Sequence, residues 1–260
     1  MAPAPPAHRR PRSKVTRGCC PTDWSPTTGA GVRWGGNLDC RGRSGKTATV
    51  KAVLAIVGCG VRLEVALADG RTAAPGLAAL PGPTPRSELV VAAVDLLLRG
   101  AGLESRDVGL ILATRGPGSF TGIRVALATA QGLARAIGCP ARGLPSLSVL
   151  AARAPGCRRV AVQGARRGFV YAQTFEDRGD APYPLDELRV VAVEALAELA
   201  DPVVPPEGLP LPAEVRVAPT IRSAAEALLA MGAAAAGEAE PLAPLYVEPP
   251  QVTPPARRVC

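Results

Sequence analysis

A regular pattern of apolar and polar residues begins at about Val50 and predicts a mixed α/β chain. Residues 53–57 form a continuous apolar run, which is typical of a strand covered on both faces, and residues 61–67 alternate between polar and apolar positions. Asp69-Gly70 then predicts a turn, so two or three strands form a meander. The sequence lacks a run of about 18 uncharged apolar residues, so we expect no membrane partner.

A helix, a strand and a second helix follow this meander. The first helix is predicted from about Ser87 to Arg99, and residues 107–114 then have the pattern of a buried strand. The second helix ends at Ile137, before the stop signals Gly138 and Pro140. It carries small residues on more than one face, which lets another helix approach closely, either within the fold or across a subunit interface.

After residue 146 the pattern starts again. Strands are predicted at 158–162 and 169–175, and helices at 191–199 and 220–231. We therefore expect a chain of four parts, namely a basic leader at 1–49, an N-terminal subdomain at 50–148, a smaller C-terminal α/β subdomain at 149–240 and an extended Pro-rich tail at 241–260.

The charge of the chain is concentrated at its start. The 260 residues carry a formal net charge of +8, but residues 1–50 contain nine basic residues and only two acidic ones. These residues have no apolar period and many prolines, so we expect them to be disordered; a true start of translation near Val50 would also explain them. Because the remaining body carries only about +1, contact with an RNA is not expected from a basic face of this chain.

The cysteine and histidine content restricts the chemistry. The seven cysteines lack the paired CxxC spacing of a zinc site and suggest a reduced, cytoplasmic protein. The only histidine is His8, so a histidine general base or a His-rich metal site is nearly excluded. We predict neither a metal site nor a resident cofactor.

The segment between the second buried strand and the second helix is rich in glycine. It reads RGPGSFTGIR at 115–124, and such a turn places free backbone amides at the positive end of a helix, where Ser119 or Thr121 can cap them. This geometry suits a phosphate, although it also makes an adequate tight turn with no ligand. Arg124 could contact a phosphate or a partner, or be a solvated charge. The candidate phosphate-binding residues are Gly116, Gly118, Ser119, Thr121, Gly122 and Arg124.

The same segment carries a family resemblance. The stretch ILATRGPGSFTGIRVALATAQGLARAIGCPARGLPSLSVLAA at 111–152 resembles the signature of the TsaB (YeaZ-like) family. GARRGFVYAQTF at 164–175 and PLYVEPPQVTPPARR at 244–258 resemble two further segments of that family. The resemblance implies the actin-like ATPase (ASKHA, ribonuclease H-like) fold, with two tandem sheet-centred subdomains.

The resemblance also implies a function. Members of this family are non-catalytic paralogues that bind the catalytic subunit TsaD and work with the ATPase TsaE. The complex places a threonylcarbamoyl group on N6 of the adenosine next to the anticodon of tRNA, and the chain could also form a homodimer. Packing of the two predicted helices against TsaD would use the apolar and small residues Val90, Val94, Leu97, Ile123, Leu127, Ala130 and Ala134.

Two departures from the family pattern argue against catalysis. Val57 and Gly164 stand where the family has carboxylates, so a magnesium-dependent nucleotide hydrolysis has no obvious ligands. We therefore expect no catalytic residue, although the losses would also be consistent with a degenerate copy. The alternative is a nucleotide-binding or nucleotide-hydrolysing enzyme of the actin-like superfamily that uses the turn at 116–122.

Overall fold

The computed structural model describes most of the chain beyond residue 51, together with two short segments before it. The described residues are 39–41, 47–49, 52–70, 72, 74–80, 86–154, 156, 158–178, 181–234 and 242–247. All of them belong to a compact unit at Gly31–Cys260. Within the predicted leader, β1 (Asp39–Arg41) and β2 (Thr47–Thr49) form an antiparallel pair that the sequence pattern did not indicate; the other leader residues lie outside the described part.

The first half of the described chain forms a five-stranded sheet. Its order is β5-β4-β3-β6-β7, in which β3 pairs antiparallel with β4 and parallel with β6, and β6 pairs parallel with β7. The predicted meander and the predicted buried strands are confirmed. The strands are β3 (Ala52–Val57), β4 (Leu63–Ala68), β5 (Gly76–Leu80), β6 (Val108–Thr114) and β7 (Ala141–Leu144).

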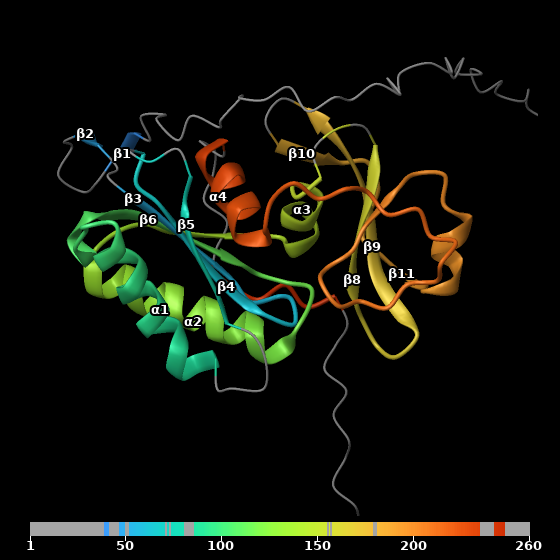
Figure 1. Cartoon of the computed structure of the whole chain (residues 1–260), viewed down its shortest axis with the longest axis horizontal. Helices are drawn as coiled ribbons and strands as arrows, with labels where there is room; N and C mark the ends of the chain where they lie inside the picture. Colours follow the sequence, from blue (N-terminus) through green and yellow to red (C-terminus); the bar gives the residue numbers. More distant parts are fainter. Residues whose placement is uncertain are drawn as a thin grey trace, which may run out of the picture. The chain divides into compact units, whose positions relative to one another are not determined.

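Helices cover both faces of this first sheet. The predicted helices are confirmed as α1 (Arg86–Gly100) and α2 (Phe120–Ile137), which lie on one face, whereas α4 (Ala224–Ala234) packs on β3, β4 and β6 from the other (Figure 1). The helix predicted at 220–231 therefore exists, but it does not belong to the second sheet, where the predicted subdomain 149–240 would place it. Its small residues explain the close packing, because a Cβ added at Gly232 would lie 2.0 Å from Leu112 Cδ1.

The second sheet also has five strands. Its order is β10-β9-β8-β12, and β11 pairs with β9 beside this path. The strands are β8 (Arg159–Gly164), β9 (Phe169–Arg178), β10 (Ala181–Pro184), β11 (Arg189–Ala192) and β12 (Val203–Val204). The short helix α3 (Ser146–Ala151) packs on β8 and spans the predicted boundary at 148. The strand pair predicted around Gly164–Gly168 is confirmed.

The helix predicted at 191–199 is wrong. The segment begins as β11, in which Val190 and Val191 pair with Tyr171 and Val170 of β9, and it continues as the short 3₁₀ helix η2 (Glu194–Glu198). β-branched residues are stiff at χ1 and fit a pleated surface better than a helix, so the valines favour the strand once β9 offers a partner. A second short 3₁₀ helix, η1 (Ser105–Asp107), precedes β6.

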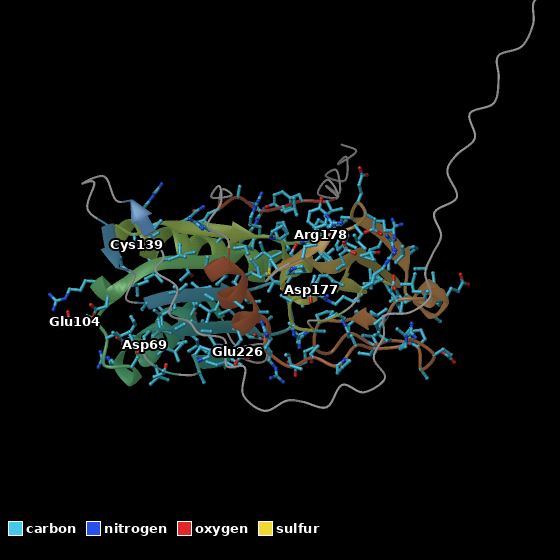
Figure 2. All side chains as sticks on the ribbon, turned by 90° about the horizontal axis from the view of Figure 1, so that it is seen from above. Asp69, Glu104, Cys139, Asp177, Arg178 and Glu226 are labelled. Atoms are coloured by element: carbon cyan, nitrogen blue, oxygen red, sulfur yellow. The ribbon has the colours of Figure 1, made fainter. Side chains whose placement is uncertain are left out.

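The second sheet has its own apolar core and one buried ion pair. Val160, Val162, Val170 and Val203 form the centre of that core. Arg159 is only 2% exposed, and its Nη2 donates to Asp177 Oδ1 at 2.5 Å while its Nε donates to Ala151 O at 2.7 Å. Asp177 and Arg178 are labelled at the end of β9 in Figure 2. In the described part of the chain, the helices are too short or too polar to cross a membrane.

Candidate functional site

The glycine-rich turn joins β6 to α2, as the sequence pattern predicts. Ser119 is the N-cap of α2, and its Oγ accepts a hydrogen bond from Gly122 N at 3.3 Å. Thr121 lies within the first turn of the helix and is exposed. Gly116 and Gly118 have φ angles of 112° and 146°, a backbone conformation that residues with a side chain rarely adopt. The turn thus needs glycine at both positions whether or not it holds a ligand.

The turn packs directly against the backbone that follows β3. A Cβ added at Gly58 would lie 2.1 Å from Gly122 O, and one added at Gly118 would lie 2.4 Å from Cys59 O. Ser119 N donates to Cys59 O at 2.9 Å, which closes this contact. These glycines therefore let two backbone segments touch.

Three amides of the turn already donate to protein oxygens. Gly116 N donates to Ser146 Oγ at 3.1 Å, Ser119 N donates to Cys59 O, and Gly122 N donates to the cap oxygen of Ser119. A phosphate bound at a helix N-terminus needs such amides free. Close packing accounts for this part of the turn, and these three amides give the phosphate hypothesis no support.

Arg124 contacts another part of the chain. Its Nε and Nη2 donate to Tyr246 Oη at 3.3 and 3.1 Å, and its guanidinium lies 3.7 Å from the centre of the Phe120 ring. Phe120 and Tyr246 are both about half exposed. Sequence reasoning missed this cluster, because the two aromatic residues lie more than a hundred positions apart.

Tyr246 belongs to a segment that we call the C-terminal strap (residues 242–247). Leu245 N donates to Arg115 O at 2.8 Å, and Arg115 Nε donates to Ala243 O at 2.9 Å. Gln131 Nε2 donates to Leu242 O at 2.7 Å. The strap therefore lies along α2, and the rest of the predicted tail at 241–260 lies outside the described residues.

The residues predicted to bind a partner mostly face the interior of the chain itself. Leu97 and Ala134 are half-buried, and the other five are buried in the first core, namely Val90, Val94, Ile123, Leu127 and Ala130. This is a correction, because a buried side chain cannot contact another protein. The sequence pattern marks the apolar stripe of each helix, and the sheet already covers that stripe.

Another face of the helices carries the exposed apolar groups. We call Leu89, Ala92 and Leu96 the α1 outer face; their spacing of three and four residues places them in one stripe, and Leu96 is 67% exposed. On α2, the small residues Ala128, Gly132 and Ala136 are exposed as well. Only the exposed fraction of each side chain distinguishes these residues from the buried stripe.

A cavity of about 380 Å³ lies at the carboxyl ends of β3, β8 and β12 and at the start of α2. Ligands of open α/β folds usually bind at such an edge. Its described lining contains one carboxylate, Glu207, which pairs with Arg62, and it contains neither lysine nor arginine. The lining residues are Cys59, Gly60, Val61, Ser119, Gln163, Gly164, Pro206, Glu207, Gly208 and Leu209.

This cavity is poorly suited to a magnesium nucleotide. Val57 and Gly164 provide no carboxylate, and Glu207 is held by an arginine. Gln163 Nε2 donates to Cys59 O at 3.1 Å, and its Oε1 is buried without a partner among the described atoms. In the described segments, groups of three or more His, Cys, Asp or Glu side chains that could hold a metal do not occur.

Cys59 beside the cavity is a thiol and not a thiolate at neutral pH. Burial raises the pKa of Cys59 to about 11, and the nearby Glu64 carboxylate adds to this effect, while a hydrogen bond with Ser146 opposes it. A nucleophilic cysteine needs a lowered pKa and access to substrate. Cys59 has neither, so its role is in packing.

Comparisons with known proteins agree with this architecture. The family model described as "TsaD: tRNA N6-adenosine threonylcarbamoyltransferase" matches residues 85–209. YeaZ from Pseudomonas aeruginosa superposes with a TM-score of 0.61 at 26% identity, covering 76% of this chain and all of YeaZ. The fold is thus that of YeaZ, and it is the predicted α/β fold with two sheets.

Sequence relatives point to the same family. The Escherichia coli "tRNA threonylcarbamoyladenosine biosynthesis protein TsaB" is 34% identical over 98 residues, which cover 36% of this chain and 42% of that protein. The uncharacterized Mycobacterium tuberculosis protein Rv3421c is 30% identical over 162 residues, covering 60% of this chain and 72% of its own length. The match therefore spans less than half of the E. coli relative. The chain belongs to the TsaB/YeaZ family.

Proposed function

We propose that this chain is a non-catalytic subunit of tRNA threonylcarbamoyladenosine modification, in which it binds and activates TsaD. Involvement in this modification follows from relatives that are named for its biosynthesis. The observation that carries the subunit role is the α1 outer face, where apolar side chains are exposed beside the small exposed residues of α2. TsaE acts on the assembled complex, and a homodimer could form through the same face when TsaD is absent.

Exposed apolar side chains on neighbouring helices favour a helical partner. Full burial of one leucine side chain stabilises a contact by about 1.5–3 kcal/mol. The small residues on α2 let a partner helix approach the backbone closely, as in packed helix pairs. TsaD would then bury the α1 outer face by adding its own helices to α1 and α2.

The absence of catalysis is supported by the cavity and by Cys59. Among the described residues that line the cavity there is neither lysine nor arginine to bind a phosphate, and Val57 and Gly164 stand where magnesium ligands would be needed. The raised pKa of Cys59 keeps this lining residue as a thiol, and the Oγ of Ser119, which also lines the cavity, caps α2. A nucleotide-hydrolysing enzyme is the alternative, and calorimetric titration with ATP and magnesium separates the two, since tight binding with turnover by the isolated chain favours the enzyme.

Copurification with TsaD tests the proposal. We expect Leu96→Arg to weaken association at least tenfold and to leave the melting temperature unchanged, because Leu96 is exposed in the free chain. Val91→Arg is the matched control, since Val91 is also an exposed apolar residue of α1 but lies off the outer face. Ala130 cannot serve in such a test, because it is fully buried and arginine there would disrupt the core.

Three results would contradict the proposal. If the native chain does not bind TsaD at micromolar concentration, the partner role is wrong. If Leu96→Arg binds TsaD normally, the α1 outer face is not the interface. If both arginine variants lose binding equally, the interface is not confined to the outer face.

A further inference from the structure

Residues 51–260 are nearly neutral as a whole, but their positive and negative charges are unevenly distributed along the chain. Residues 108–175 contain nine arginines and no Asp, Glu or Lys. Residues 176–260 contain fourteen acidic residues and six arginines. A count over the whole body therefore averages a basic segment with an acidic one.

Most arginines of the basic segment have an internal role. Arg159 pairs with Asp177 and Arg158 with Asp201, while Arg153 donates to Pro205 O at 3.0 Å. Arg158 is also exposed, but four other exposed arginines do not lie in an ion pair with a carboxylate within the described ranges. We call these the open arginines: Arg124, Arg135, Arg166 and Arg167.

The open arginines lie on two elements, α2 and the β8–β9 hairpin, and the start of α2 and the end of β8 border the cavity. Arg124 and Arg135 are eleven residues apart on α2, which is close to three full turns, so they lie in one stripe of the helix. Arg166 and Arg167 lie at the tip of the β8–β9 hairpin, two and three residues after Gly164. Gly164 and Ser119, the N-cap of α2, both line the cavity.

Two of these guanidinium groups are stacked on aromatic rings. Arg124 lies 3.7 Å from the centre of the Phe120 ring, and Arg166 lies 4.4 Å from the centre of the Phe169 ring. A stacked guanidinium loses less freedom on binding and keeps N–H groups at its edge for an anion. The surface thus offers two stacked guanidinium groups on two separate elements, and in Arg124 the Nε and Nη2 groups also donate to Tyr246 Oη.

We propose that the open arginines form a surface that binds the phosphate backbone of an RNA. Cations spread over two elements suit a polyanion. The choice of RNA among polyanions rests on the proposed function. This inference replaces the expectation, drawn from net charge alone, that no basic face of this chain contacts RNA.

Salt-dependent binding of a tRNA transcript to the full chain, measured by fluorescence anisotropy, tests this inference. The test variant is Arg166→Glu/Arg167→Glu. It spares Arg124, because that residue holds the C-terminal strap, and Arg135, because it shares a face of α2 with Ala128 and Gly132, the small residues of the proposed TsaD contact. Each phosphate contact contributes about 0.7–0.9 to the slope of log K against log salt. We therefore expect the double variant to lower the slope by about 1.4–1.8 and to weaken binding at least tenfold in low salt.

The matched control is Arg106→Glu/Arg178→Glu, which makes the same change in net charge at exposed arginines elsewhere. The basic leader is present in every variant, so its contribution to RNA binding is the same in all of them and does not affect the comparison. We expect the control to keep the native slope. An unchanged slope in the test variant, or an equal loss in both variants, would overturn the inference.

Two further measurements distinguish RNA binding at this surface from membrane binding and from TsaD binding. Loss of binding to anionic phospholipid vesicles by the test variant, with RNA binding unchanged, would assign the surface to a membrane instead. Association of the test variant with TsaD is measured in parallel without RNA. A variant that no longer binds RNA but still binds TsaD supports the inference. If RNA binding is unchanged, the RNA inference is wrong, and the TsaD measurement still tests the proposed function by itself.

Discussion

Substitution of Gly122 by alanine tests whether packing or a ligand explains the glycine-rich turn. Gly122 lies in the first turn of α2, and a Cβ there would lie 2.2 Å from Gly58 O. Real Cβ atoms essentially never approach another atom closer than 3.0 Å, so the two backbone segments would have to separate by about 1 Å. No side-chain rotation can relieve this contact, because the atom that it meets belongs to the backbone.

The cost of that separation lies at the upper end of the range for overpacked positions, at about 3 kcal/mol. For a chain of this size, 1 kcal/mol corresponds to about 2–4 °C in melting temperature. We therefore expect Gly122→Ala to melt about 6–12 °C below the native chain. Thermal unfolding followed by circular dichroism measures this difference directly.

The same helix offers a matched control. Gly132 is exposed, and nothing lies within 4 Å of a Cβ added there. Alanine is a better helix former than glycine, so Gly132→Ala should raise stability by about 0.5–1 kcal/mol. Equal melting temperatures for the two variants would refute the packing argument, and the glycines of the turn would then require another explanation, such as a bound anion.

Further predictions concern the core and two ionisable groups. Leu228→Ala should lower stability by about 2–5 kcal/mol in urea titrations, because Leu228 is fully buried between α4 and the first sheet. Because the pKa of Cys59 rises from 9.0 unfolded to about 11 folded, stability should fall between pH 9 and 11 by about 1.4 kcal/mol per pH unit, and Cys59→Ala should lose that part of the slope. At pH 8, iodoacetamide should label the half-buried Cys139 faster than Cys59, as mass spectrometry of peptides would show. Burial alone would raise the pKa of Asp186, but hydrogen bonds from Thr174 and the Arg189 guanidinium outweigh it and hold this pKa below its ordinary value. The stabilisation by Asp186 is therefore present above about pH 4 and lost in acid, so Asp186→Asn should lower stability by about 1–3 kcal/mol at pH 7 and by less at pH 3.

Much of the fold could be predicted from the sequence, because most elements have a clear apolar period. The continuous apolar run at 53–57 predicts a buried strand, and the apolar stripe of α2 predicts an amphipathic helix. The segment at 191–199 misled the prediction, since valines at helical spacing pair as a strand when β9 provides an open edge. The return of α4 to the first sheet was equally hidden, because periodicity shows that a helix has an apolar face but not which sheet covers it.

The candidate sites were harder to predict than the fold. The sequence predicted Ser119 or Thr121 as the helix cap, and the structure shows that it is Ser119. The sequence left open whether the glycines serve a ligand or a close contact. It could not separate the stripe around Val94, which the first sheet buries, from the exposed stripe around Leu96, because both are apolar. Contacts such as Arg124 with Tyr246 depend on where distant segments meet, and no local pattern records that.

The position of α4 has a consequence for synthesis of the chain on the ribosome. β6 is complete at Thr114, but the helix that covers its second face is not complete until Ala234. At about 5–20 residues per second, translation of the intervening segment takes roughly 6–24 s. During that time one face of the nascent first sheet, which includes Leu112, is exposed to water, and α4 buries it later. The half-made protein is thus a natural client for chaperones, and its first sheet reaches its final stability only near the end of translation.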